Sequence, residues 1–328
     1  MYNFGVKLLF VFIFSFLISF YLVPLFAKVA FKLNILDIPD GNLKKHKAPT
    51  PYLGGLAIWF GFIVSSSLVL PFEHQFFLYI MASTILLFIG LFDDLIALTP
   101  MQKFLGQFIA VLCYLKAGFY LKVSFFSSSW NILISAFWFL LIINAFNLVD
   151  VMDGLATTIA CAVTICYIIF ALLFGYQILL LFLFAFLGAL VAFLVFNRPP
   201  ARIYLGDAGS LFVGGMVASM PFSISWSEYN SFGYFIPFIL CAIPLIEVGT
   251  LIIVRSLKHQ PFFYGSPDHF SIFLQEKGWA KKYILFYVFF LTLLLGIISI
   301  YFFYNFISLP MLLIIWLLFL FFWYFILL

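Results

Sequence analysis

The sequence predicts an all-α, polytopic integral membrane protein with about eleven transmembrane helices. Of its 328 residues, 66% are hydrophobic and 9% are charged, whereas soluble domains carry roughly 25% charged residues. Apolar runs of about 18 to 22 residues recur along the chain, each long enough to cross a hydrocarbon core about 30 Å thick. Barrel strands would alternate apolar and polar residues over about 10 positions. The composition therefore excludes a soluble enzyme, and the runs exclude a barrel.

The apolar runs define the expected helices in chain order. The first run is too long for a removable signal peptide and no small-residue cleavage site follows it, so it is expected to remain as a helix. No soluble domain interrupts the series, and residues 1–328 are expected to form a single integral membrane domain. The expected spans are about 5–27, 53–70, 75–92, 104–121, 130–149, 154–174, 177–196, 210–226, 232–254, 283–304 and 307–328.

Basic residues gather in alternate loops between the expected helices. All but three of the 16 Lys and Arg residues fall in the loops after the first, third, seventh and ninth spans. The three on the other side are Lys7, Lys116 and Lys122. Short loops rich in Lys and Arg stay in the cytoplasm. The sequence therefore predicts that the N-terminus lies outside and that these four loops are cytoplasmic.

Acidic residues fall on the same predicted face, although they contribute little to orientation. The cytoplasmic acids are Asp37, Asp40, Asp93, Asp94, Asp150, Asp153, Asp207, Asp268 and Glu276. Glu73 and Glu228 fall outside, and Glu247 lies within the ninth span, where it is expected to pair with a neighbouring helix or to line a site. A transporter would place such groups near the bilayer midplane. The distribution favours a membrane enzyme with a cytoplasmic active site over a transporter.

Two adjacent carboxylates, Asp93 and Asp94, end the third span, and Lys103 follows at the start of the fourth. Neighbouring carboxylates repel each other, which raises the pKa of one of them unless a cation lies nearby. The pair is therefore a candidate site for Mg²⁺ or for a general base. A solvated helix end is the alternative interpretation.

Amides and carboxylates recur at spacings of three between the fifth and sixth spans. Asn144, Asn147, Asp150 and Asp153 would share one face of a helical turn or of its continuation. Asn and Asp also cap helices, but a cap needs one such residue rather than four. The pattern favours a polar, ligand-binding face.

A Gly-rich segment, Gly206 to Ser210, opens the eighth span, and Arg202 and Tyr204 precede it. Small residues let the backbone approach a ligand closely, and exposed amides at the start of a helix suit a phosphate. Asp207 would then be a metal ligand, and Tyr204 would offer a face on which a base can stack. An ordinary Gly-rich turn between helices is the alternative.

Two further cytoplasmic loops carry basic groups. Lys45 and His46, in the first loop, are candidates for phosphate contact, with attraction to anionic lipid headgroups as the alternative. His269 follows Asp268 in the last loop. It is a candidate to bind phosphate or to position a proton, and a solvated histidine is the alternative.

Taken together, these motifs resemble the polyprenyl-phosphate N-acetylhexosamine-1-phosphate transferase family, whose bacterial members are integral membrane enzymes. The matches follow the family's order along nearly the whole chain. They are Asp37-Ile38-Pro39 and residues 46–55 in the first loop, Asp93-Asp94 with Lys103, residues 144–154 and residues 200–210.

The resemblance implies transfer of a sugar-1-phosphate from a UDP-sugar to undecaprenyl phosphate, giving a lipid-linked diphosphate sugar and UMP. It implies Mg²⁺ as cofactor, with Mn²⁺ as the alternative ion, and a location in the bacterial cytoplasmic (inner) membrane. Membrane lipid is a further expected partner, nucleic acid is not, and a homodimer is left open. The implied metal ligands are Asp207 and Asp94, and the implied catalytic residues are Asp93, Asp94, Asp150, Asp153, Lys103 and His269. The implied substrate-binding residues are Asn144, Asn147, Tyr204, His46, Lys45, Arg202 and Gly206.

The sequence departs from the family pattern at two places. Val151 stands where Asp-Gly is common, and His269 stands alone where several histidines usually cluster. The single histidine argues against the branch that transfers phospho-MurNAc-pentapeptide in peptidoglycan synthesis, which stays the alternative. The chain is more similar to the branch that uses UDP-GlcNAc or a related UDP-HexNAc to prime O-antigen, enterobacterial common antigen or teichoic-acid assembly.

Overall fold

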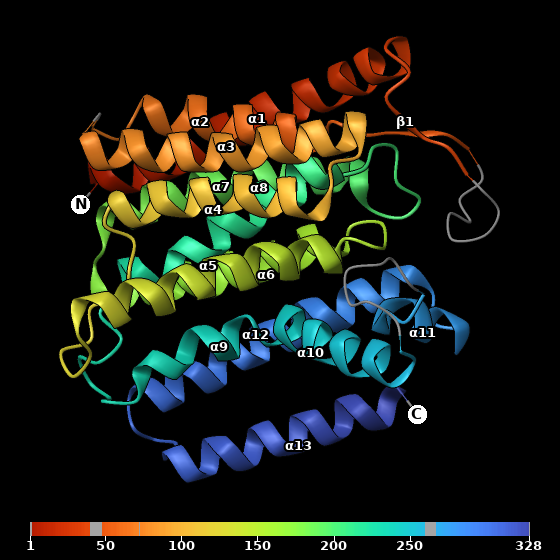
Figure 1. The fold of residues 1–328 in the computed structure, drawn as a ribbon. Coiled ribbons are helices and arrows are strands. Elements are labelled where there is room, and N and C mark those ends of the chain that lie inside the picture. Colours follow the sequence, from red (N-terminus) through yellow and green to blue (C-terminus); the bar gives the residue numbers. More distant parts are fainter. Residues whose placement is uncertain (1, 40–47, 72, 260–266, 328) are drawn as a thin grey trace.

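The computed structural model describes residues 2–39, 48–71, 73–259 and 267–327. These residues form a bundle of roughly aligned helices with loops at its two ends (Figure 1). The helices are α1 (Tyr2–Lys32), α2 (Gly54–Ser67), α3 (His74–Ile96), α4 (Pro100–Lys116), α5 (Ser128–Val149), α6 (Leu155–Phe174), α7 (Gln177–Asn197), α8 (Gly206–Ser219), α9 (Ile236–Leu240), α10 (Ala242–Leu257), α11 (Phe270–Glu276), α12 (Lys281–Phe303) and α13 (Leu309–Leu327). Two short 3₁₀ turns cover Met220–Ser223 and Gly233–Phe235.

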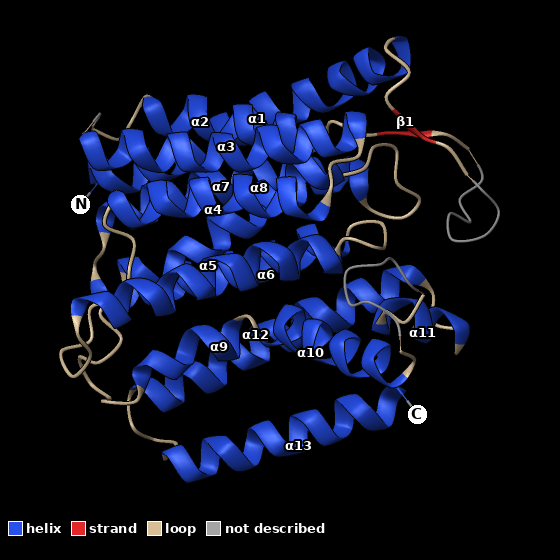
Figure 2. Cartoon of the chain, in the orientation of Figure 1, coloured by secondary structure: helices blue, strands red, loops and turns tan. Residues whose placement is uncertain are grey.

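Helix dominates the described part of the chain (Figure 2), and each expected span overlaps at least one helix. Among the described residues, six helices are long and apolar enough to cross a membrane, namely α1, α3, α5, α6, α7 and α12. Helices α9 and α10 add a seventh if the bent pair is one span. Helices α2 and α13 are shorter but apolar. The prediction of an all-α, multi-pass membrane protein is confirmed at this level, and the count of eleven spans stays a prediction.

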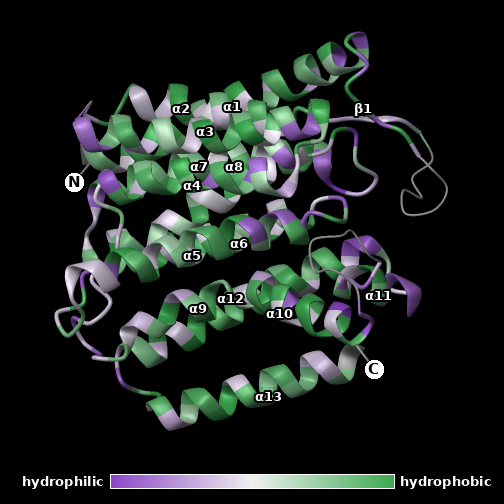
Figure 3. Ribbon diagram, viewed as in Figure 1, coloured by the Kyte–Doolittle hydropathy of each residue, from purple (hydrophilic) through white to green (hydrophobic). Residues whose placement is uncertain are grey.

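Apolar residues cover the helices along their length, and polar residues concentrate toward the two ends of the bundle (Figure 3). The N- and C-termini lie at opposite ends (Figure 1). An odd number of passes places the termini on opposite sides of a membrane, as the predicted eleven spans require.

The ninth expected span is broken. Helices α9 and α10 meet at Cys241 with a bend of 71°. Pro244 lies four residues after Leu240, the last residue of α9, and has no N–H to donate to the Leu240 carbonyl. The break therefore has an identifiable cause in the sequence.

Helix α8 lies at the centre of the half of the bundle that carries the predicted site. All of its residues except Asp207 are buried. Glycines let it approach its neighbours closely: a Cβ on Gly55 of α2 would overlap the backbone of Gly209, and one on Gly90 of α3 would overlap the carbonyl of Asp207. Small residues at such crossings are the usual means by which membrane helices pack. The packing fixes the start of α8 against the end of α3.

A two-stranded antiparallel ribbon, β1 (Leu36–Asp37) with β2 (Thr50–Pro51), rises from the end of the bundle where α3 ends and α8 begins (Figure 1). The loop before α8 joins this ribbon, because Tyr204 N–H donates to the Pro51 carbonyl at 2.8 Å. The first loop and the Gly-rich segment are therefore held together by backbone hydrogen bonds.

Candidate active site

Four helix ends meet at one end of the bundle. Asp93 and Asp94 lie in the last turn of α3, and Lys103 lies in the first turn of α4. Asn147 lies in the last turn of α5, and Asp207 lies in the first turn of α8. The helices bring together residues that are more than 100 positions apart in the chain.

Lys103 is the centre of this cluster. Its Nζ atom lies 2.8 Å from Asp93 Oδ2, forms a second ion pair with Asp207, and lies 3.4 Å from Asn147 Oδ1. The side chains of Lys103, Asp93 and Asp207 are 18%, 15% and 32% exposed. One ammonium group thus compensates two carboxylates in a site that retains some access to solvent.

Asn147 completes the cluster on the α5 side. Its Nδ2 group donates to Asp207 Oδ1 and to Ser210 Oγ, both at 2.9 Å. With Nδ2 committed to these acceptors, Oδ1 is the atom that faces Lys103, and the amide orientation follows from its partners. Asn147 therefore holds Oδ1 of the Asp207 carboxylate, while Lys103 pairs with Oδ2.

Asp94 has a different role from its neighbour Asp93. Its two oxygens accept the backbone N–H groups of Asp207 at 2.9 Å and of Ala208 at 3.1 Å. Helix α8 has no side-chain cap of its own, and the first N–H groups of a helix otherwise lack partners. Asp94 thus caps α8 from another helix and sets the position of Asp207.

Gly206 makes this arrangement possible. Its φ is +72°, and a Cβ there would lie 2.7 Å from Asp94 Oδ2. Only glycine adopts this left-handed conformation without steric cost. The glycine predicted from the sequence to approach a phosphate contacts the capping carboxylate in the structure.

A second pair of amides extends the contact between α4 and α5. Gln107 Nε2 donates to Asn144 Oδ1 at 3.2 Å, and Asn144 Nδ2 donates to Gln107 Oε1 at 2.8 Å. Asn144 therefore faces α4 rather than Asp207. Gln107 and Ser210 were not among the predicted site residues. The signal for Gln107 was its i, i+4 spacing from Lys103, which places both residues on one face of α4, just as the i, i+3 spacing places Asn144 and Asn147 on one face of α5.

Asp150 and Asp153 lie in the turn after α5. Burial, followed by the nearby carboxylates of Asp207, Asp94 and Asp153, raises the pKa of Asp150 well above its usual range. Asp153 Oδ2 accepts from Lys281 Nζ at 3.0 Å and from the N–H of Ala201 at 3.3 Å. Asp153 thus joins this turn to the start of α12 and to the loop before α8.

The remaining predicted residues lie around the cluster. The Tyr204 ring lies against Tyr52, with ring centroids 6.2 Å apart and planes tilted by 50°, and burial raises the pKa of the Tyr204 hydroxyl. Arg202 is exposed, and His269 is buried against Glu247. Lys45 and His46 fall outside the described residues. The structure therefore joins Asp93, Asp94, Lys103, Asn147 and Asp207 directly, whereas Asn144, Asp153, Tyr204 and His269 make their recorded contacts elsewhere.

The oxygen donors in the cluster have the chemistry that Mg²⁺ prefers. Mg²⁺ commonly binds one or two carboxylates and completes its shell with water and substrate phosphates. Asp207 and Asp93 supply two carboxylates, and Asn147 supplies an amide oxygen facing the same ammonium group. Within residues 2–39, 48–71, 73–259 and 267–327, no three acidic, His or Cys side chains converge as a complete metal site. The residues thus fit an ion that also relies on substrate oxygens.

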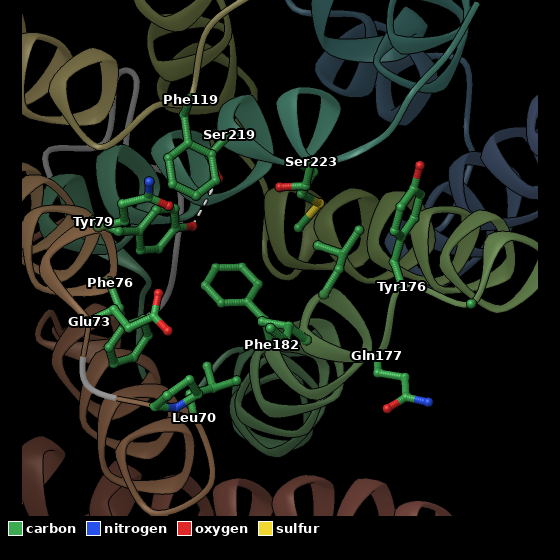
Figure 4. Close-up of a pocket in the computed structure, with 16 residues that line it drawn as sticks. Leu70, Glu73, Phe76, Tyr79, Phe119, Tyr176, Gln177, Phe182, Ser219 and Ser223 are labelled. Carbon is green, nitrogen blue, oxygen red and sulfur yellow. Dashed lines mark hydrogen bonds between the residues drawn. The ribbon is translucent and has the colours of Figure 1, made fainter. Parts of the chain in front are cut away.

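A cavity of about 630 Å³ lies at the other end of the same helices (Figure 4). Tyr79, Phe76 and Phe182 line it, and the Tyr79 hydroxyl is 2.9 Å from Ser219 Oγ. Tyr79 is near the start of α3 and Ser219 ends α8, whereas the carboxylate cluster uses the opposite ends of both helices. This cavity contains none of the predicted site residues.

The fold and the cluster define a multi-pass helical membrane protein with an ionic, oxygen-rich centre at one end of the bundle. Residues 76–225 match the family described as glycosyl transferase family 4. This match includes the Asp93–Lys103–Asn147–Asp207 cluster.

Similar proteins extend the comparison beyond that segment. A probable undecaprenyl-phosphate N-acetylglucosaminyl 1-phosphate transferase of Bacillus subtilis is 27% identical over 89% of this chain and 84% of its own length. A phospho-N-acetylmuramoyl-pentapeptide-transferase of Clostridium perfringens is 30% identical over 80% of this chain and 85% of its own length. A phospho-N-acetylmuramoyl-pentapeptide-transferase of Streptococcus pneumoniae is 32% identical over 64% of this chain and 71% of its own length. The chain belongs to glycosyl transferase family 4, and the resemblance recognised from its motifs is confirmed.

Proposed function

We propose that the protein transfers a HexNAc-1-phosphate, GlcNAc-1-phosphate in particular, from a UDP-sugar to undecaprenyl phosphate at the cytoplasmic face of a bacterial inner membrane. The products are undecaprenyl-diphosphate-sugar and UMP, and the reaction primes the synthesis of a cell-surface polysaccharide such as O-antigen or teichoic acid. The observation that carries this proposal is the Asp93–Lys103–Asp207–Asn147 cluster at the polar end of an apolar bundle.

The cluster suits the meeting of two phosphates. An oxygen of the lipid phosphate attacks the phosphorus that bears the sugar, the new P–O bond forms, and the bond between the two phosphates of the UDP-sugar breaks to release UMP. Such a transfer depends on positioning and on neutralising negative charge. Lys103 supplies a positive charge between Asp93 and Asp207. We favour this direct attack over a covalent aspartyl intermediate.

Mg²⁺, or Mn²⁺ in its place, would neutralise the diphosphate and the leaving UMP when bound. Asp207 is the proposed principal ligand, because Lys103 and Asn147 hold its carboxylate at the open part of the cluster. Asp94 was also expected to bind the metal. Since both of its oxygens accept backbone N–H groups of α8, we assign it first to positioning Asp207.

The two substrates require different surroundings. The polyprenyl tail needs apolar helix surface, which the bundle offers along its length (Figure 3). The nucleotide needs the polar loops, and we assign Asp150, Asp153 and Tyr204 to its side of the site. Tyr204 is partly exposed beside Tyr52, which favours contact between an aromatic face and the uracil base.

Transfer of phospho-MurNAc-pentapeptide is the alternative function. It is favoured by the relatives of that name, at 30% and 32% identity. The lone His269 argues against it, because the histidine cluster expected for that branch is missing from the printed sequence.

UMP release tests both functions. Purified protein would receive Mg²⁺, undecaprenyl phosphate and, in separate reactions, UDP-GlcNAc, UDP-GalNAc or UDP-MurNAc-pentapeptide, with Asp207→Asn as the blank. We expect release with a UDP-HexNAc and none with the pentapeptide. Release with the pentapeptide alone would establish the alternative, and silence of a folded sample with all three would refute both.

A further inference from the structure

A buried carboxylate on α10 holds the histidine of the last loop. Glu247 is 1% exposed and His269 is 4% exposed, and Glu247 Oε1 lies 2.9 Å from His269 Nδ1. Glu247 lies just beyond the break between α9 and α10. An ionisable side chain within a membrane helix is costly to bury and usually serves a function. The pairing therefore calls for an explanation beyond packing.

The same oxygen also fixes the backbone beside the histidine. Glu247 Oε1 accepts the N–H of Phe270 at 3.3 Å. His269 precedes the first turn of α11, and its own side chain makes no cap hydrogen bond. One carboxylate oxygen thus holds both the imidazole ring and the start of α11. These two contacts restrict rotation of the ring relative to the helix.

The pairing also selects the tautomer of His269. An ionised Glu247 only accepts hydrogen bonds, and in that state Nδ1 carries the proton of the 2.9 Å contact. In the neutral ring Nε2 is then the acceptor nitrogen, and in the charged ring it is the second donor. Either way, Nε2 is the nitrogen left for a ligand.

The cluster at α8 contains the same kind of contact between a carboxylate and the start of a helix. Asp94, from α3, accepts the first N–H groups of the helix that carries Asp207. Glu247, from α10, accepts the first N–H group of the helix that follows His269. In both cases a carboxylate from one helix fixes the start of another helix beside a residue assigned to the reaction.

We propose that Glu247 is a positioning residue of the transferase, which fixes the tautomer and orientation of His269 so that Nε2 meets a substrate phosphate. This proposal rests on the proposed function for the role of His269. The pairing itself does not depend on that function. It can therefore be tested without turnover.

Nitrogen NMR of histidine-labelled protein in detergent tests the pairing. His269→Gln identifies the His269 signal, and we expect the wild-type protein to show a proton held on Nδ1. Glu247→Gln keeps the side-chain shape but removes the charge, and we expect the signal to shift toward a mixture of tautomers. Ser271→Ala is the matched control, because Ser271 is buried on α11 and its hydroxyl has no hydrogen-bond partner among the described residues. An unchanged His269 signal in Glu247→Gln would overturn the proposal.

Kinetics separate positioning from mere structural support. We expect Glu247→Gln to lower kcat by about 10- to 100-fold, as loss of an orienting partner does in other sites, with KM for the UDP-sugar changed less than about twofold. In the His269→Gln background the second substitution should have little further effect on kcat, because Glu247 acts through that ring. Fully additive losses would instead show that Glu247 only caps α11 and would overturn the proposal. If wild-type protein releases no UMP from any UDP-sugar, the proposed function fails while the NMR result still decides the pairing.

Discussion

Lys103 shows how one side chain can determine the state of a site. Its ammonium group pairs with both Asp93 and Asp207 and faces Asn147. Two carboxylates this close would repel each other without a cation, and one would gain a proton. The residue is thus expected to support both the charge balance of the resting protein and the binding of phosphate.

Lys103→Met should remove the charge while keeping much of the side-chain volume. We expect UMP release to fall by about 100-fold or more. We expect the free energy of unfolding to fall by about 1–3 kcal/mol, less than for a fully buried pair because solvent screens these partly exposed groups. Lys116→Met is the control, since Lys116 is exposed at the other end of α4. Equal behaviour of the two variants in thermal unfolding and turnover would contradict the central role of Lys103.

Gly206 and Gly175 form a second matched pair at the residue scale. Both have positive φ, +72° and +70°, but only at Gly206 would a Cβ meet another group, Asp94 Oδ2. We expect Gly175→Ala to lower the free energy of unfolding by about 1–2 kcal/mol through backbone strain alone. Gly206→Ala should lose more stability and also lose activity, because the clash disturbs the cap of α8. The interpretation fails if thermal unfolding and UMP release do not separate the two variants.

At the scale of elements, the close crossing of α3 and α8 determines where the carboxylates meet. Gly90 lies one turn before Asp94 on α3 and faces the backbone carbonyl of Asp207. A side chain there cannot be relieved by rotating a flexible neighbour, since the obstacle is main chain. The distance between the two helices is therefore coupled to the geometry of the site.

Gly90→Ala is expected to push α8 away from α3. Overpacking of this kind typically costs about 1–3 kcal/mol, and the displacement should weaken the Asp94 cap and lower UMP release. Gly5→Ala provides the control, because a Cβ on Gly5 of α1 meets nothing within 4 Å. Thermal unfolding and turnover of both variants would be compared in the same detergent. If the Gly90→Ala protein is as stable and active as Gly5→Ala, the crossing of α3 and α8 tolerates an added methyl group and the interpretation is wrong.

The sequence predicted helices better than it predicted their ends and connections. Apolar runs fix the helices because length and hydrophobicity are properties of each segment, and the polar motifs at run boundaries indicated one polar end. The ribbon of Leu36–Asp37 with Thr50–Pro51 and the helix Phe270–Glu276 were not predicted, since two paired residues or two turns carry too little periodicity. The break before α10 was also not predicted, although Pro244 was a readable signal.

In the candidate site, too, features within one helix were predicted and contacts between helices were not. Spacing predicted that Asn147 would share a polar face, and Asn147 contacts Asp207 and Ser210. Spacing did not predict that Asp94 would cap α8, because that contact depends on the crossing of two helices and joins residues that are 113 positions apart in the chain. Contacts between distant helices follow from packing, which a single run of sequence does not encode.

At the scale of the whole molecule, the carboxylate cluster and the aromatic cavity of Figure 4 lie at opposite ends of α3 and α8, and the predicted topology places them on opposite sides of the membrane. The distribution of Lys and Arg predicts that the cluster faces the cytoplasm, where UDP-sugars are expected to be available. Helix α4 links the two ends, from Lys103 near the cluster to Phe119 just beyond its last residue, at the cavity. The direction in which α4 crosses the membrane therefore shows which side of the membrane the cluster faces.

Two exposed residues, one in the first turn of α4 and one in the loop after it, provide the test. Met101 is 65% exposed at the end with the cluster, and Phe125 is 75% exposed in the loop after α4. Each would be changed to Cys and treated with a membrane-impermeant maleimide in right-side-out and inverted vesicles, with the unsubstituted protein as control for Cys113, which is partly exposed. We expect Phe125→Cys to react in right-side-out vesicles and Met101→Cys to react in inverted ones, because positive loops stay inside. The reverse pattern would place the cluster outside the cell, where the proposed UDP-sugar substrate is not expected. Reaction of both positions from the same side would mean that α4 does not cross the membrane.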